Sequence, residues 1–153
     1  MFRPEKSPDI DVSGQNQVTL EERRLTLLDS HTGQTGTRSG LNHGQRDGRD
    51  PNQAYIPVPV HVQETGFFPP DGVQFTVRTD DDRSMLMACG GTGGKNLMTP
   101  QRNSLLGEYF RSRLGLSSGE YVTTETLTSY RSTADVVFRK IDTESYLMDF
   151  SPN

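Results

Sequence analysis

The sequence predicts a mainly β, barrel-like domain. Several short segments alternate apolar and polar residues between turns rich in Gly, Pro and Asp, which is the pattern of short strands. Only two segments have helical spacing. Apolar residues are also unevenly placed, because 10 of 47 lie in the first 53 positions and 37 in the last 100. Many short strands with few helices favour a closed or nearly closed sheet, since closure removes exposed edges.

The first third of the chain is polar. Residues 1–17 carry scattered charges without an apolar period, so we expect a flexible tail or linker, followed by one domain over residues 18–153. Residues 18–28 favour a strand by their alternation. Residues 35–52 are dense in Gly, Arg, Asn, Gln and Asp. This composition fits either a solvated loop or a polar recognition surface.

The compact body begins near Tyr55. Residues 55–60 are rich in β-branched residues, but Pro57 and Pro59 restrict them to an edge or irregular strand. Three further pieces of β structure are expected: a hairpin over 73–88, a short strand over 95–98, and a terminal hairpin over 134–150.

One helix is expected over residues 104–114, where a stripe of Leu, Tyr and Phe recurs at helical spacing. Asn103 is a candidate N-cap, and Gly115 stands where a left-handed residue ends many helices. A second, shorter helix is expected after Thr123, with Leu127 on its apolar side.

Residue patterns for catalysis or metal binding are weak. His31, His43 and His61 form no metal-binding pair, so no metal is predicted. Residues 90–96 fail the phosphate-loop spacing, because Cys89 takes the place of its first glycine and Asn96 that of its hydroxyl residue.

Two further groups have both a chemical and a structural interpretation. Cys89 could be a nucleophile with His61 as its base, but its place at the end of an apolar strand favours a structural cysteine. Residues 80–82, three consecutive Asp, are better explained by a tight polar turn than by a cation site. We therefore predict no catalytic residues and no cofactor.

The charge balance excludes a uniformly basic nucleic-acid binder, because the net charge is -4 and the isoelectric point is about 5.3. However, 13 of the 16 basic side chains are Arg, which matches guanine edges and phosphates well. Two segments carry net positive charge, +1 over residues 38–50 and +3 over residues 95–113. The single cysteine and the lack of a membrane-length apolar run favour a cytoplasmic protein.

Two polar, Arg-bearing segments remain unexplained by the barrel, namely residues 38–53 and 95–104. Asn and Gln can bond adenine, Arg can bond guanine, and Asp or Glu can accept from cytosine. The segments therefore have the side chains of major-groove recognition, although solvated loops would have a similar composition.

The order of several motifs adds to this interpretation. Residues 38–46 (Arg38-Ser-Gly-Leu-Asn-His-Gly-Gln-Arg46), 66–70 (Gly66-Phe-Phe-Pro-Pro70), 103–111 (Asn103-Ser-Leu-Leu-Gly-Glu-Tyr-Phe-Arg111) and 146–151 (Tyr146-Leu-Met-Asp-Phe-Ser151) resemble the C-terminal part of NgoFVII-type restriction endonucleases. The similarity runs from about residue 18 to residue 151. It implies a plant B-three-like, seven-stranded open pseudobarrel with two short α-helices, which clasps the major groove of double-stranded DNA between two arms.

The resemblance places DNA-binding residues on both arms. They are Arg38, Asn42, Gln45, Arg46 and Arg49 in the first, and Lys95, Asn96, Gln101, Arg102 and Asn103 in the second. Two departures affect these regions: His43 stands where the family pattern has Trp, and the chain is unusually rich in Gly after Met87.

The resemblance implies that the family's phospholipase-D-like nuclease domain cuts the DNA. The H-x-K-x(4)-D signature of that domain is absent from this sequence. We therefore expect a specificity domain of a bacterial type II restriction enzyme, either separated from its nuclease or free-standing, with a nuclease domain or subunit as a possible partner. No membrane and no small-molecule cofactor are expected. The alternative is a protein-interaction module of a restriction or defence system that contacts an acidic partner.

Overall fold

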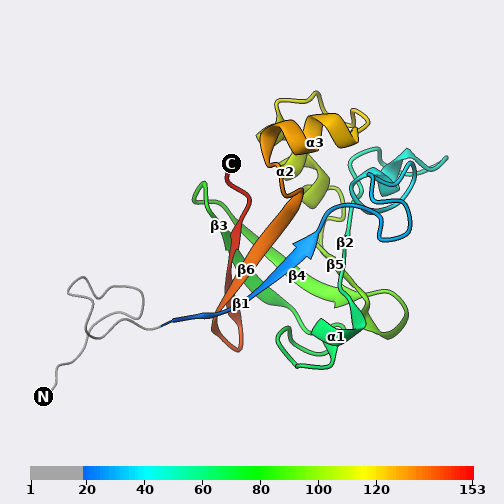
Figure 1. Ribbon diagram of the computed structural model, residues 1–153. Helices are drawn as coiled ribbons and strands as arrows, with labels where there is room; N and C mark the ends of the chain where they lie inside the picture. Colours follow the sequence, from blue (N-terminus) through cyan, green and yellow to red (C-terminus); the bar gives the residue numbers. More distant parts are fainter. Residues whose placement is uncertain (1–18) are drawn as a thin grey trace, which may run out of the picture.

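Seven strands form one sheet that curls into a nearly closed barrel (Figure 1). The computed structural model describes residues 19–153, so the tail expected at residues 1–17 lies outside the described residues. The strands are β1 (Glu21–Thr26), β2 (Ile56–Pro57), β3 (Phe75–Thr79), β4 (Ser84–Gly90), β5 (Asn96–Met98), β6 (Asp135–Asp142) and β7 (Ser145–Asp149). Their order in the sheet is β1-β6-β7-β3-β4-β5-β2. The predicted pseudobarrel class is confirmed.

Both expected hairpins are present. Strands β3 and β4 pair antiparallel across the turn at residues 80–83, and β6 and β7 pair antiparallel across a two-residue turn. The two hairpins are joined by a parallel β3–β7 pair, with Val77 opposite Tyr146. Strand β2 is an edge strand of two residues, as Pro57 and Pro59 predict, and it pairs with β5.

The barrel is filled by the inward side of these strands. On β3, Phe75 and Val77 are buried while their neighbours are exposed, which is the alternation seen in the sequence. The ring of Phe68, from the loop before β3, lies 5.3 Å from the ring of Phe138 and 5.5 Å from that of Tyr146. This aromatic cluster gives the barrel a closely packed centre.

Three α-helices accompany the sheet: α1 (Val60–Gln63), α2 (Leu105–Leu114) and α3 (Thr124–Tyr130). The longer two are those expected, and α2 ends at a left-handed Gly115. The Thr123 hydroxyl caps α3 by accepting a hydrogen bond from the Thr126 amide. Within residues 19–153, no helix is long and apolar enough to cross a membrane.

Two local expectations were wrong. The strand expected over residues 55–60 is shorter, because β2 comprises only Ile56–Pro57 and the helix α1 begins at Val60. Asn103 does not cap α2: the helix begins one residue later, behind Ser104, whose side chain makes no capping hydrogen bond.

Candidate nucleic-acid interface

The first arm, residues 38–53, folds into a compact lobe between β1 and β2. Its centre is a short 3-10 helix, η1 (Gly40–Gln45). Leu41 is the apolar side chain of the lobe that reaches the core. Polar contacts must therefore hold the rest of the lobe in place.

Asn42 supplies the most deeply buried of these contacts. Its Nδ2 donates to the carbonyls of Gly36 and Val122, at 2.8 and 2.9 Å, and its Oδ1 accepts from the Val122 amide at 2.8 Å. The residue has 0% exposure. This position corrects the prediction that Asn42 binds DNA, because its amide is occupied by the fold and has no surface to offer.

The first arm packs on the segment between α2 and α3, residues 115–123. Asn52 donates to the Ser118 hydroxyl at 2.9 Å and accepts from the Gly119 amide at 2.8 Å. Gln45 donates to the Gly119 carbonyl at 3.1 Å and remains half-buried. On helix α2, a Cβ atom at Gly107 would lie 1.8 Å from the Asn52 carbonyl oxygen. Only glycine allows this approach of helix and arm.

Arg111, on α2, connects the first arm, α2 and residues 115–123 from the interior of the protein. It is 1% exposed, and it donates to the main-chain carbonyls of Glu120 at 2.7 Å, Leu41 at 3.2 Å and Gly107 at 3.3 Å. Burial lowers the pKa of its guanidinium, whereas the charges of Asp50 and Glu120 raise it. Sequence analysis missed this residue, since a helical Arg in a polar segment gives no signal of burial.

The three arginines of the first arm itself point to solvent. Arg38, Arg46 and Arg49 are exposed, and within residues 19–153 none forms an ion pair with a carboxylate. Within the described residues, the Arg46 side chain donates only to the Arg38 carbonyl, and the Arg49 side chain only to the Gln53 side chain. Seven arginines elsewhere do form ion pairs, at 2.7 to 3.6 Å: Arg23, Arg24, Arg83, Arg102, Arg113, Arg131 and Arg139.

The second predicted arm is divided by strand β5. Lys95 is exposed at the glycine-rich turn between β4 and β5, and Asn96 is the first residue of β5. Three other residues lie beyond β5, in the loop before α2: Gln101, Arg102 and Asn103. The five residues therefore do not share one loop.

The residues of that later loop differ in their contacts. Arg102 binds both carboxylate oxygens of Glu108 at 2.7 Å, and Gln101 donates to the Gln74 side chain at 3.2 Å. Asn103 is exposed. A ligand would have to compete with Glu108 for the Arg102 guanidinium.

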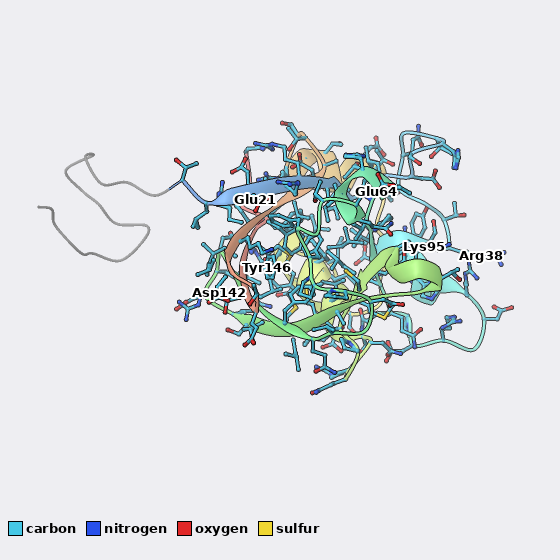
Figure 2. All side chains as sticks on the ribbon, turned by 90° about the horizontal axis from the view of Figure 1, so that it is seen from below. Glu21, Arg38, Glu64, Lys95, Asp142 and Tyr146 are labelled. Atoms are coloured by element: carbon cyan, nitrogen blue, oxygen red, sulfur yellow. The ribbon has the colours of Figure 1, made fainter. Side chains whose placement is uncertain are left out.

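The first arm and the β4–β5 turn lie on the same side of the molecule. Strand β2, which follows the arm, pairs with β5, and the Val58 amide donates to the Lys95 carbonyl at 2.7 Å. Figure 2 shows Arg38 and Lys95 on one side, with Glu21 and Asp142 on the opposite side. The unpaired cations of the arm and turn thus face away from these acidic residues.

The cysteine and two of the aspartates that the sequence offered for catalysis or cation binding are buried or held in ion pairs. Cys89 is buried, and burial, with a smaller effect of Asp71, raises the pKa of its thiol to about 11. Little thiolate would exist at neutral pH, which disfavours a nucleophile. The Asp80 and Asp81 carboxylates form ion pairs with Arg113. No group of three or more His, Cys, Asp or Glu side chains within residues 19–153 could hold a metal ion.

One protein family matches the chain. The sequence model for the NgoFVII C-terminal B3-like DNA-binding domain covers residues 11–142. That range includes every element from β1 to the end of β6, and thus both arms and the helices that anchor the first arm. No curated protein matches the chain.

Proposed function

The chain belongs to the family of NgoFVII C-terminal B3-like DNA-binding domains, and from this premise we propose that it binds double-stranded DNA sequence-specifically, with two arms in the major groove. The observation that carries the proposal is the contrast among arginines. The barrel's arginines are mostly held in ion pairs, whereas Arg38, Arg46 and Arg49 form none within the described residues. Unpaired guanidinium groups can bind phosphates and guanine edges without first losing an internal partner.

The anchoring of the first arm supports readout of bases as well as attraction to phosphates. Base recognition requires side chains held in a defined register. Here Asn42, Asn52 and Arg111 hold the arm's main chain against α2 and the segment after it. Arg46 and Arg49 therefore project from a firm support. The Gln45 side-chain oxygen accepts no hydrogen bond from residues 19–153, so it could accept from adenine or cytosine.

The second arm is proposed on the β4–β5 turn, with Lys95 and Asn96 as its contacts. Lys95 is exposed and forms no ion pair with any described carboxylate. We propose a smaller part for Gln101, Arg102 and Asn103, because β5 separates them from the turn and Glu108 binds Arg102. On this proposal, Arg102→Ala weakens binding less than Arg46→Ala does.

The wider role is proposed from the family. NgoFVII-type domains serve restriction enzymes, so this chain would supply the DNA specificity of a bacterial type II enzyme, with cutting done by a phospholipase-D-like nuclease domain or subunit. Such a protein would work in the cytoplasm, where the DNA is. Its own residues would position the DNA without breaking bonds.

Selection from a pool of random duplexes tests this function. The purified chain should enrich a short motif at moderate salt, and Arg46→Ala should weaken binding to it by about 1–3 kcal/mol if the side chain makes a bidentate base contact. Arg78→Ala is the matched control, because Arg78 is also exposed and unpaired within residues 19–153 but lies on β3, away from the arms. No enrichment, with no retention even at low salt, would favour a protein-interaction module instead.

A further inference from the structure

His43 lies in the first arm and has an unusual ring environment. Its Nδ1 is buried and has no hydrogen-bond partner, and it is the one buried side-chain nitrogen or oxygen of residues 19–153 in this condition. Buried polar atoms without partners are rare in folded proteins, and each calls for an explanation. Nothing in the packing of the arm requires a nitrogen at this place.

Burial of Nδ1 determines where the ring carries its proton. An unpaired buried N–H is less tolerable than an unpaired lone pair, so the neutral ring keeps its proton on Nε2. Burial, followed by the charges of Arg49 and Arg46, lowers the pKa of the ring. At neutral pH the ring is therefore uncharged, with Nε2 as its only donor.

The ring is also fixed in orientation. It packs edge-on against the Tyr55 ring, with centroids 5.2 Å apart and planes at 72°. His43 is half-buried, and its Nε2 has no hydrogen-bond partner within residues 19–153 yet is absent from the buried atoms in that condition, so Nε2 retains some exposure to solvent. A phenylalanine ring would fill the same space without an unpaired nitrogen. Compared with phenylalanine, the imidazole lowers the stability of the fold, but it places one oriented donor on the arm that carries Arg46 and Arg49.

We propose that His43 is a specificity-determining residue, which donates a hydrogen bond from Nε2 to an acceptor on a base edge of the bound duplex. The acceptors available in the major groove are purine N7, guanine O6 and thymine O4. This role rests on the proposed function, because it needs DNA in contact with the first arm. It adds a neutral donor near the charged residues Arg46 and Arg49, and a neutral donor discriminates by position, not by charge.

The test compares His43→Phe and His43→Gln with the unchanged chain by selection from random duplexes and by thermal unfolding. The Phe variant should be at least as stable as the parent, yet lose about tenfold of its preference at one base pair while keeping the rest of the motif. The Gln variant retains a donor and should recover part of that preference. A Phe variant that folds but is less stable than the parent, or a Gln variant no better than Phe, would contradict the proposal.

The outcomes separate the two proposals. If the parent selects a motif and the Phe variant selects the same motif equally well, His43 is not a reader and the DNA-binding proposal stands. If the parent selects nothing, the proposed function fails and this role fails with it. If the Phe variant does not fold, nitrogen NMR of the parent is the deciding test. The resonance of the His43 Nε2 should shift when the selected duplex is added, and the resonance of Nδ1 should not.

Discussion

Arg113 on α2 and Arg46 on the first arm show two opposite uses of the same side chain. Arg113 is 11% exposed at its side chain, binds Asp80 at 2.7 Å, and also donates to the Phe150 carbonyl. Arg46 is exposed, and among the described residues its side chain donates only to the carbonyl of Arg38. The first ties a helix to the barrel, and the second forms no ion pair within residues 19–153. Arginine content alone therefore says little about DNA binding, whereas the pairing of each arginine says a great deal.

The two regions are also held together by different forces. The barrel is stabilised by apolar burial around Phe138 and Tyr146, both nearly free of solvent contact. The first arm is stabilised by side chains that bond main-chain groups, chiefly Asn42 and Arg111. Damage to the barrel should unfold the whole protein, while damage to the arm's anchors should release the arm first.

The largest effect is expected in the barrel. Phe138→Ala removes a fully buried ring that packs on Phe68, so it should lower the free energy of unfolding by about 3–5 kcal/mol. Urea unfolding followed by circular dichroism measures this. A loss below about 1 kcal/mol would mean that the aromatic cluster is not the main source of stability.

An intermediate effect is expected at the arm's anchor. Arg111→Met leaves the carbonyls of Leu41, Gly107 and Glu120 without their donor, which should cost about 1–3 kcal/mol. Hydrogen exchange should quicken in residues 38–53 more than in β3 or β6. Arg24→Met is the control, because Arg24 is exposed and its ion pair with Asp135 should contribute less than about 1 kcal/mol. Equal quickening in arm and barrel would show that Arg111 has no local role.

A smaller effect is expected from acid. Burial raises the pKa of Asp80, but hydrogen bonds from Arg113 and the Phe150 amide outweigh it and lower that pKa below its usual 3.8. The carboxylate's contribution is present above that value and is lost as the pH falls below it. Because the pair is partly solvated, we expect about 1 kcal/mol or less. Unfolding of the parent and of Asp80→Asn between pH 2 and pH 6 should converge at the acid end.

The smallest effect on stability is expected at the exposed arginines. Replacing Arg38, Arg46 and Arg49 together by Ala should change the free energy of unfolding by no more than about 0.5 kcal/mol. If all three contact phosphates, the slope of log affinity against log salt should fall by about 2.7. Binding titrations at several salt concentrations measure the slope, with Arg78→Ala as control. A slope that stays unchanged would remove the first arm from the interface.

The barrel could be predicted well because its signals are local. Alternation along β3 and β7, the prolines at positions 57 and 59, and Gly115 after α2 each act within a few residues. The parallel β3–β7 pair could not be predicted, since it joins residues about seventy positions apart. Helix α1 was missed because one helical turn has too few residues to show a period.

The sequence located two polar, Arg-bearing segments but did not reveal the contacts of each side chain in them. By itself, the sequence determined where the polar arms lie along the chain, since composition and motif order are properties of the chain alone. Only the tertiary structure decided that Asn42 and Arg111 are buried and hold the first arm in place. It also decided that Glu108 forms an ion pair with Arg102 and that β5 separates Lys95 from Asn103. The physical reason is that a polar side chain finds its partner across long sequence separations. Whether an arginine or asparagine is buried or free to bind DNA therefore depends on contacts that appear only after folding.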